Sequence, residues 1–366
     1  MAKNLLILGN LNNEPKGEAK LLRFLPVLFS VAENISLIAA NCPAEYKNKV
    51  FWIQAEHVIK KRKNILTRIV NFVLTQIKLV LLLGTMPRKV KYEIIMFLRP
   101  YPLPMLFARL IGKKVIRYQG GVASKEPSTI AFLSRLLIEE PAAFLSHKII
   151  IQSKSCLEFQ NLYRYRKKVE IGNFPIDTQF FKCQKDPKER ENIIGYIADL
   201  TENKGIRNFL DAILILRNKD FKFIIGGEGP LSEEIRKKID ENDLTDKVTL
   251  AGWIPHDEMP TYLNKLKLLI LPSSSEGIPT ILLEAMLCGT PILATPVGGI
   301  PDILKDGENG FVLPNNSPEN IASGIIRALD HPFLSKIAKN GQELLEKEYR
   351  HEAAVGRFKN ILADLK

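Results

Sequence analysis

The chain has 366 residues, 46% of them hydrophobic and 25% charged, which is the composition of a soluble globular protein too long for one typical core. Its four cysteines include no C-x-x-C pair, which excludes a dense disulfide framework and favours a reducing compartment. The first ten residues contain one lysine and a short apolar run without a signal-peptide pattern. We therefore expect a buried first strand there and a cytoplasmic protein.

Short apolar segments alternate with amphipathic segments through the first half of the chain. The expected strands are NLLILGN (4–10), NISLIAANC (34–42), YEIIMFL (92–98), KKVIRYQGG (113–121) and HKIIIQS (147–153). Amphipathic helices are expected at 17–32, 104–112 and 128–146. This alternation is typical of βαβ units with a parallel sheet.

The second half repeats the plan. Strands are expected in NIIGYIADL (192–200), FKFIIGGEGP (221–230), KVTLAGW (247–253), LKLLILPS (266–273), PILATP (291–296) and GFVLP (310–314). Helices are expected between them, at 206–218, 231–242 and 279–289. The segment 172–190 carries Gly, Pro and charge but little periodicity, so we place the domain boundary there, at 175/176. The sequence therefore predicts two doubly wound α/β domains facing across a cleft, with ligands at the carboxyl ends of the strands.

Charge is divided unevenly between the two halves. Residues 1–175 contain 28 Lys and Arg against 11 Glu and no Asp, or +17, and the remainder contains 24 against 29, or −5, which together give the net charge of +12. This asymmetry indicates two domains with different partners. The basic half should favour an anionic surface such as phospholipid head groups, a lipid-linked phosphate or nucleic acid.

Residues 57–92 depart from the alternation because they contain nine Lys and Arg and no acid. Their apolar stretch, 69–83, is interrupted by Asn71, Thr75, Gln76 and Lys78, and it is shorter than the roughly 20 apolar residues that a membrane span needs. We therefore expect a basic amphipathic helix at an anionic membrane surface. A core-facing helix of the first domain with solvated lysines remains the alternative.

The stretch SSSEGIPTILLEAM (273–286) places Glu276 just before a predicted helix and Glu284 inside it. Pro279 suits the first helical position, and Gly289 suits the end. Glu284 would lie about 7 Å further along the helix axis than the helix start. Two carboxylates on either side of a helix start suit a ligand that has a diphosphate in the middle and a sugar at each end.

The start of this helix is a candidate anion site. Backbone N–H groups of Thr280 and Ile281 would be free there, and the helix dipole would strengthen their attraction for a phosphate. Gly277 would let a ligand approach the backbone closely.

The segment 248–314 closely resembles the group 1 (family 4) retaining glycosyltransferases of the GT-B fold. The family's Glu-x7-Glu signature falls on Glu276 and Glu284, and its "vGGipeii" continuation begins at Val297. Weaker matches extend over most of the chain: NFPIDTQFF (173–181), GGEGP (226–230) and NKG (203–205). NNEPKGEAK (12–20) resembles the family's glycine-rich loop after the first strand.

The resemblance implies a role for each matching residue. Glu284 would bind the ribose hydroxyls of a nucleotide, Glu276 the hydroxyls of the donor sugar, and Lys204 the diphosphate. The remaining matches are a nucleotide-side loop at Gly227, Glu228 and Gly229, a base-side border at Trp253 and Ile254, and an acceptor or phosphate loop at Lys16 and Gly17. Tight turns and a core tryptophan are equally good explanations of the Gly227 and Trp253 segments.

The resemblance also implies a domain plan. Residues 1–175 would bind the acceptor, 176–345 would bind the nucleotide-diphosphate sugar, and a C-terminal helix, 346–366, would pack back on the first domain.

Two positions depart from the family pattern. Asp199 stands where many members carry an arginine before the phosphate lysine, so either Arg207 substitutes for it or donor binding is altered. Gly120, with Arg117 and Gln119 nearby, stands where many members carry a histidine, so no general-base histidine is implied. The chain has no D-x-D sequence and no His/Cys cluster, and we expect neither a metal nor another cofactor.

Four functions remain open at this point. The first is a retaining glycosyltransferase with a lipid-linked or cell-envelope glycan acceptor, acting in polysaccharide or glycolipid biosynthesis as a peripheral protein on the cytoplasmic membrane face. The second is a non-catalytic relative that serves as a binding or scaffold subunit, which Asp199 motivates. A hydrolysing epimerase of the same fold would need no acceptor. A nucleic-acid-binding protein has only the basic half in its favour, since no recognition motif is present.

Overall fold

The computed structural model describes residues 2–9, 11, 15–58, 64–86, 90–120, 129–159 and 161–365. The chain divides into two compact units, Met1–Pro175 with His351–Lys366 (unit 1) and Ile176–Arg350 (unit 2). The chain passes from unit 1 to unit 2 between residues 175 and 176, where we expected the boundary. The second boundary falls after Arg350, five residues later than expected, because α13 (Leu334–Glu348) ends just before it and α14 (His351–Ala363) starts a new helix.

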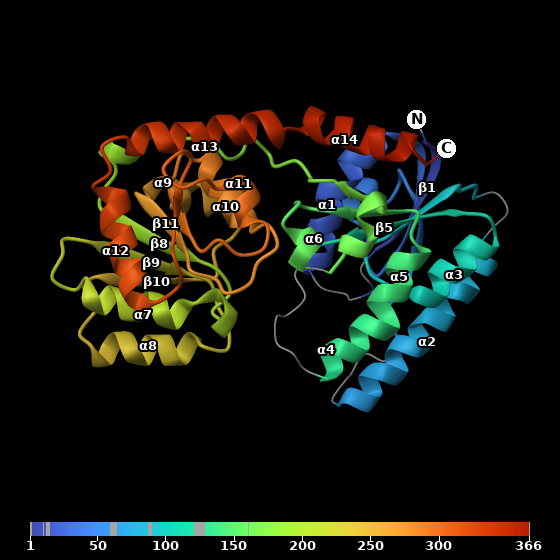
Figure 1. Ribbon diagram of the computed structural model, residues 1–366, viewed down its shortest axis with the longest axis horizontal. Coiled ribbons are helices and arrows are strands. Elements are labelled where there is room, and N and C mark those ends of the chain that lie inside the picture. The colour runs from blue at the N-terminus through green and yellow to red at the C-terminus, as the bar shows by residue number, and fades with distance from the viewer. Residues whose placement is uncertain are drawn as a thin grey trace. The chain divides into compact units, whose positions relative to one another are not determined.

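Unit 1 is built on a seven-stranded parallel sheet with the order β3-β2-β1-β4-β5-β6-β7. Its strands β1 and β5 are labelled in Figure 1. Its strands are β1 (Ala2–Leu8), β2 (Ala32–Ala39), β3 (Phe51–Gln54), β4 (Ile94–Phe97), β5 (Lys114–Gln119), β6 (Lys148–Ile151) and β7 (Val169–Ile171). Strand order reverses between β1 and β4, which makes the sheet doubly wound. The inner strands are continuous apolar runs because helices cover both faces.

The helices of unit 1 cover the two faces of this sheet with separate cores. On one face, α1 (Pro15–Phe29) and α14 pack around Phe24 and Phe358, so the C-terminal helix returns to unit 1. On the other face lie α2 (Ile65–Gly84), α3 (Pro102–Leu110) and α5 (Glu140–Leu145). The shorter elements are η1 (Ala44–Tyr46), α4 (Thr129–Ser134), the π-helical segment η2 (Arg135–Glu139), α6 (Cys156–Phe159) and η3 (Tyr163–Lys168).

Helix α2 buries three polar residues together with Leu79 and Leu83, and it exposes most of its other apolar residues. Asn71, Thr75 and Gln76 are buried. The backbone N–H of Leu103 donates to Gln76 Oε1 (3.0 Å), and Thr75 Oγ1 lies 3.2 Å from His57 Nδ1. The exposed residues are Ile65, Leu66, Ile69, Val70, Val73, Leu74, Ile77 and Leu81. Three of the four polar interruptions seen in the sequence therefore lie in the inward stripe of the helix, beside Leu79 and Leu83.

The length of α2 corrects an expectation. The helix has 20 residues with a mean hydropathy of 1.7, and it is long and apolar enough to cross a membrane by length and composition alone. The expectation counted only residues 69–83. The helix is longer than that because it begins directly after a capping box on Asn64. In the structure one stripe of α2 packs against α3, and only 22% of its apolar window is buried.

Unit 2 repeats the doubly wound plan with a six-stranded parallel sheet, β10-β9-β8-β11-β12-β13. Its strands are β8 (Ile193–Ile197), β9 (Lys222–Gly226), β10 (Val248–Gly252), β11 (Leu268–Leu271), β12 (Ile292–Ala294) and β13 (Phe311–Val312). Its helices are η4 (Pro187–Glu189), η5 (Glu202–Lys204), α7 (Ile206–Ile215), α8 (Ser232–Glu241), α9 (Met259–Lys265), α10 (Thr280–Leu287), α11 (Ile300–Ile303), α12 (Pro318–Leu329) and α13. Strand order reverses between β8 and β11, and two doubly wound domains confirm the predicted fold class.

Candidate functional site

The candidate site lies at the carboxyl ends of β8 and β11, the two strands between which the order reverses. Doubly wound sheets bind ligands at this position. β8 leads into the turn η5, and β11 leads into the SSSEG loop before α10. The two loops are joined by a hydrogen bond from the backbone N–H of Ser274 to the carbonyl of Asn203 (2.9 Å). Residues about 70 positions apart in sequence are therefore held side by side.

Lys204 and Glu276, the two expected catalytic residues, form an ion pair. Lys204 Nζ lies 2.6 Å from Glu276 Oε1, and the Ser273 hydroxyl donates to the same oxygen at 2.7 Å. Glu276 is only 8% exposed, and such a short charge-assisted bond is strong where water is scarce. The hydroxyl of Tyr196, in strand β8, donates to the Lys204 carbonyl (3.2 Å). Burial raises the pKa of Tyr196, and the nearby carboxylates of Glu276 and Asp199 raise it further, so this hydroxyl stays protonated.

Three glycines fix the position of the Glu276 loop. Gly298 has φ of +60°, and a Cβ built on it would lie 1.7 Å from the carbonyl oxygen of Glu276. The backbone N–H of Gly299 donates to the carbonyl of Gly277 (2.8 Å). Gly277 thus holds the loop through its backbone. Gly298 has no side chain because the Glu276 backbone occupies that space.

Glu284 lies inside α10 and is 5% exposed. Its Oε1 is 3.8 Å from His256 Nε2. The imidazole of His256 stacks on Phe180, with ring centroids 5.3 Å apart and planes 7° apart. The sequence did not single out His256 or Phe180, because their proximity to Glu284 arises only when two separate loops meet helix α10.

The start of α10 differs by one residue from the expectation. Pro279 is the N-cap, with an extended ψ of 125°, so Thr280 is the first helical residue and Ile281 the second. The proline ring restricts φ but leaves ψ free, and the chain is still extended at this residue. The end is as expected, since Gly289 has φ of +65° directly after the Cys288 C-cap.

The Gly227–Gly229 loop packs its backbone on the loop after β8. A Cβ on Gly227, which has φ of +117°, would lie 1.9 Å from the Ala198 carbonyl oxygen, and a Cβ on Gly229 would lie 2.4 Å from that of Leu200. The backbone N–H of Leu200 donates to the Glu228 carbonyl (3.0 Å). These glycines therefore have a packing reason of their own, and they also bring Glu228 to the same end of the sheet as Lys204.

The two residues suggested as the border of the base differ in exposure. Trp253 is 68% exposed, whereas Ile254 is 6% exposed and packs against Gly226. Only Trp253 therefore offers a face to a ligand.

Arg207, suggested as a substitute for the family arginine, is already bound. Its Nε and Nη2 contact the two carboxylate oxygens of Glu234 (2.6 Å each), and Nη1 contacts Glu202. The hydrogen bonds that Arg207 donates to Glu234 raise the pKa of Arg207, with Glu202 adding to the effect. In this structure Arg207 therefore serves an ion-pair network on the surface of unit 2.

The two residues of unit 1 that were matched to a glycine-rich loop, Lys16 and Gly17, lie in a helix instead. Lys16 and Gly17 lie in the first turn of α1, which begins at Pro15, so the expected loop at 12–20 is helical from that residue onward. Residues 12–14 and the side chain of Lys16 are outside the described part of the chain. Gly120 follows β5 directly. Arg117 is buried within that strand and is hydrogen-bonded to the Glu139 carbonyl (3.1 Å).

Within the described ranges, no three His, Cys, Asp or Glu side chains gather in a group that could hold a metal ion.

The fold is shared with solved glycosyltransferase structures. The crystal structure of Anabaena HepE in complex with UDP and glucose matches 100% of both chains with a TM-score of 0.77 at 16% identity. A structure described as the lipopolysaccharide outer core galactosyltransferase WaaB covers 99% of both chains with a TM-score of 0.74 at 15% identity. The two doubly wound units therefore have the GT-B fold, as the sequence predicted.

Unit 2 identifies the family. Residues 177–348 match the family described as "Glycosyl transferases group 1", and this range is nearly the whole of unit 2. Unit 2 is a group 1 glycosyl transferase domain, which confirms the resemblance carried by Glu276 and Glu284. The α-D-kanosaminyltransferase of Streptomyces kanamyceticus is 30% identical over 176 residues, 47% of this chain and 46% of the relative. This chain spans about half the length of the curated relatives that it matches.

Proposed function

We propose that the protein is a retaining glycosyltransferase that moves a sugar from a nucleotide-diphosphate sugar to a lipid-linked or cell-envelope glycan acceptor. The Lys204–Glu276 pair carries the proposal, because it occurs at the ligand-binding position of a group 1 glycosyl transferase domain. HepE, which has the same fold, was solved in complex with UDP and glucose, and this supports a nucleotide-diphosphate sugar as the donor. The reaction would need no metal or other cofactor.

In the proposed reaction, each residue of the pair takes a new partner when the donor binds. Lys204 moves to the diphosphate and Glu276 accepts hydrogen bonds from hydroxyls of the donor sugar. Glu284 accepts hydrogen bonds from the ribose hydroxyls. The backbone N–H groups at the start of α10, at Thr280 and Ile281, add positive potential for the phosphates.

The chemical step breaks the bond between the sugar's anomeric carbon and the phosphate oxygen, and that oxygen keeps the electron pair. The acceptor hydroxyl oxygen bonds to the anomeric carbon on the same face, and its proton passes to the leaving phosphate oxygen. Negative charge therefore develops on the nucleoside diphosphate, where the fixed charge of Lys204 stabilises it. Because the leaving phosphate takes the proton, the mechanism requires no general-base histidine in unit 1.

We propose that unit 1 holds the acceptor at the cytoplasmic face of a membrane, docked through residues 57–92. Eight large apolar side chains of α2 face solvent, and soluble monomers rarely expose so large an apolar face. Residues 1–175 carry a net charge of +17, which favours anionic lipid. WcaL of Escherichia coli, 28% identical over 55% of this chain and 52% of its own length, is named as a putative colanic acid biosynthesis glycosyltransferase, which supports an acceptor of the cell-envelope class.

A non-catalytic scaffold is the second candidate, and Asp199 favours it. This carboxylate stands close enough to affect Tyr196, in the loop that carries Lys204, and a negative charge there repels a diphosphate. Binding of a nucleotide sugar without any transfer or hydrolysis would support this candidate.

The first test is a thermal-shift screen with UDP-, GDP- and ADP-sugars, comparing the wild type with Glu284→Ala. One nucleotide class should raise the Tm of the wild type, because a ligand that binds only the folded state stabilises it. Glu284→Ala should lose most of that rise. No rise with any nucleotide sugar would overturn the proposal for unit 2.

The stereochemistry is tested on the product of the donor so identified. NMR of the product should show the same anomeric configuration as the donor sugar. An inverted product would contradict the retaining mechanism, and free sugar formed without an acceptor would indicate a hydrolase.

A further inference from the structure

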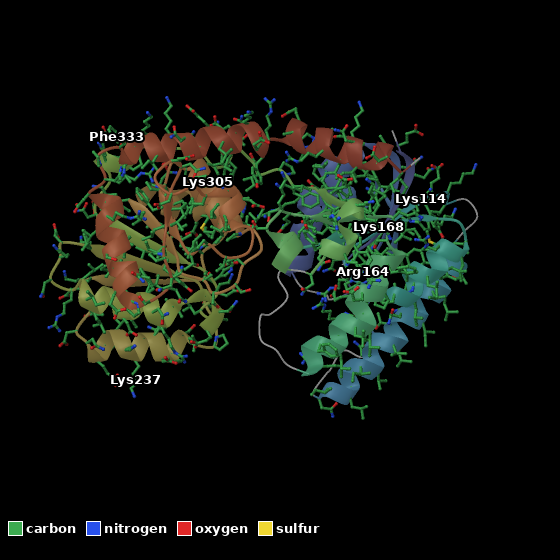
Figure 2. All side chains as sticks on the ribbon, in the orientation of Figure 1. Lys114, Arg164, Lys168, Lys237, Lys305 and Phe333 are labelled. Atoms are coloured by element: carbon green, nitrogen blue, oxygen red, sulfur yellow. The ribbon has the colours of Figure 1, made fainter. Side chains whose placement is uncertain are left out.

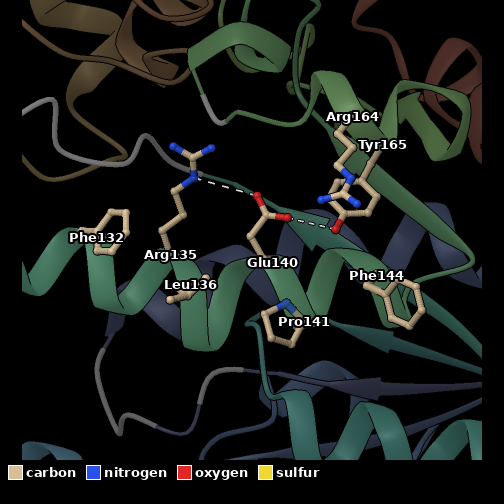
Figure 3. Close-up of a pocket in the computed structure, with 8 residues that line it drawn as sticks. All are labelled: Phe132, Arg135, Leu136, Glu140, Pro141, Phe144, Arg164 and Tyr165. Carbon is tan, nitrogen blue, oxygen red and sulfur yellow. Dashed lines mark hydrogen bonds and ion pairs between the residues drawn. The ribbon is translucent and has the colours of Figure 1, made fainter.

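Unit 1 contains a pocket that the proposed reaction does not use. It has a volume of 640 Å³ and lies between η3 and the continuous helix formed by α4, η2 and α5 (Figure 3). Its lining residues are Phe132, Arg135, Leu136, Glu140, Pro141, Phe144, Arg164 and Tyr165. α5 ends just before β6 and η3 ends just before β7, so this pocket extends toward the amino ends of those strands. Donor-type ligands of doubly wound sheets bind at the carboxyl ends.

The helix beside the pocket is widened for an identifiable reason. Pro141 has no N–H to donate, and its ring clashes with the carbonyl one turn earlier, which favours a wider turn. The π-helical segment η2 lies in that turn. Arg117, buried in β5, bonds to the carbonyl of Glu139 (3.1 Å) and pairs with its carboxylate. The widened turn is therefore held from inside the unit, with Arg135 and Leu136 on its pocket side.

Two arginines line this pocket, on either side of the Glu140 carboxylate (Figure 3). The single acid of the lining, Glu140, accepts a hydrogen bond from the Tyr165 hydroxyl (2.9 Å), and its other oxygen is 3.9 Å from Arg135 Nε (Figure 3). Arg164 is exposed on η3 and forms no ion pair with any residue of the described part of the chain. Lys168, on the same turn, adds a third positive charge nearby (Figure 2). The balance of charge favours an anion.

The rest of the lining is apolar and continues onto the surface. Phe132, Leu136 and Phe144 are both pocket-lining and exposed. α3 packs against both α2 and α5, so the three helices form one layer (Figure 1). The other exposed apolar side chains of this layer are Leu133 and Leu137 on the α4–η2 helix, Leu103, Leu106 and Leu110 on α3, and the eight of α2.

We infer that this pocket binds the head group of an anionic lipid, with the phosphate at Arg135 and Arg164 and the first chain carbons against Phe132, Leu136 and Phe144. The inference rests on the proposed docking of α2 at a membrane. It adds a second, specific contact, because an arginine guanidinium binds a phosphate with paired hydrogen bonds. The layer of α2, α3 and α5 then supplies apolar area, and the pocket supplies selection for a phosphate-bearing lipid.

The test is a calorimetric titration of the full chain with dihexanoyl phosphatidic acid, a water-soluble lipid, below its micelle concentration. Arg164→Gln and Arg135→Gln should each weaken binding about tenfold, the loss of one charge-assisted contact. Lys359→Gln removes the same charge from α14, on the opposite face of the sheet, and should bind like the wild type. Circular dichroism melting checks that each variant is folded.

Two comparison ligands and one further variant decide the result. Dihexanoyl phosphatidylcholine, which has the same chains and no net charge, and inorganic phosphate, which has no chains, should each bind about tenfold more weakly or worse. Equal binding of inorganic phosphate would overturn the lipid assignment, and an unchanged affinity in both arginine variants would overturn the site. The double variant Leu66→Gln/Val73→Gln should lose vesicle binding yet keep the soluble lipid. Vesicle binding through α2 without soluble-lipid binding would overturn the pocket alone, whereas the reverse result would overturn the α2 docking alone.

Discussion

Helices α2 and α10 both bury polar side chains, for opposite reasons. In α2, the amide of Gln76 and the hydroxyl of Thr75 are hydrogen-bonded within unit 1, and the apolar outer face is exposed in the described part of the chain. In α10, Glu284 is a carboxylate in a helix otherwise packed in the core of unit 2. Burying a charge is expensive unless it is paired or bound. Under the proposed function, Glu284 in α10 would contact the donor and the outer face of α2 would contact a membrane.

The largest effect is expected at the site near α10. Lys204→Ala and Glu276→Ala should each lower turnover about a hundredfold or more, because each removes an aligned charge from the reacting groups. Lys237→Ala, on the surface of α8 (Figure 2), removes the same charge at a distance and should leave turnover unchanged. Steady-state kinetics with the identified donor measures all three variants. Near-normal rates for Lys204→Ala would contradict the catalytic role of the Lys204–Glu276 pair.

The α2 surface should show the next largest effect. Leu66→Gln/Val73→Gln should weaken partitioning into anionic vesicles roughly 30-fold, since each buried aliphatic side chain contributes about 1.5–3 kcal/mol at most. Ile215→Gln, which replaces an exposed apolar residue on α7 of unit 2, is the matched control and should partition normally. Vesicle flotation measures this, and equal partitioning of both proteins would leave the apolar face of α2 without a membrane role.

A smaller loss is expected when the support of the Glu276 loop is disturbed. Gly298→Ala should lower turnover about tenfold and Tm by several degrees, because its Cβ would collide with the Glu276 carbonyl and its φ is positive. Gly307 has a similar φ of +71° with open space around it. Gly307→Ala therefore shows the effect of backbone strain without a collision. Equal turnover of the two variants would mean that the Glu276 position tolerates displacement.

The smallest effect concerns acid stability of unit 1. The backbone N–H of Val115 donates to His147 Nδ1 (2.9 Å). Burial lowers the pKa of His147, and Arg109, Lys114 and Lys168 lower it further. The folded state then binds fewer protons than the unfolded state, so stability falls as pH drops below the ordinary histidine pKa of about 6.5 and levels off below the lowered pKa. Scanning calorimetry should show this slope in the unit 1 transition, and His147→Asn should flatten it; an unchanged slope would contradict the assignment.

The sequence predicted most of the fold because its signals were local. All six strands of unit 2 were expected, and α10 was placed within one residue at its start by Pro279 and at its end by Gly289. The strands that escaped prediction, β3 and β7, are edge strands of unit 1 of only four and three residues. The π-helical segment before Pro141 also escaped, because a proline in a helix signals a break without saying how the chain adapts.

The site was predictable in its members but not in its contacts. The family motif placed Lys204, Glu276 and Glu284, yet nothing in their spacing says that Lys204 pairs with Glu276, since that contact depends on β8 lying next to β11. His256 carried no chemical signal of its own, and Gly298 was matched only as part of the family continuation that begins at Val297. For α2, periodicity defined a polar and an apolar stripe but could not tell which of them faces inward.

In α2, the residues that attach the helix to unit 1 differ from the residues that face outward. Its hold on unit 1 comes from the buried Leu79 and Leu83 and from hydrogen bonds such as that of Leu103 N–H to Gln76 Oε1, which need the same acceptor. Its outer side chains are exposed in the described part of the chain, so they can exchange among Leu, Ile, Val and Phe without loosening the helix. Related chains could therefore diverge on this outer face while the inward stripe stays fixed.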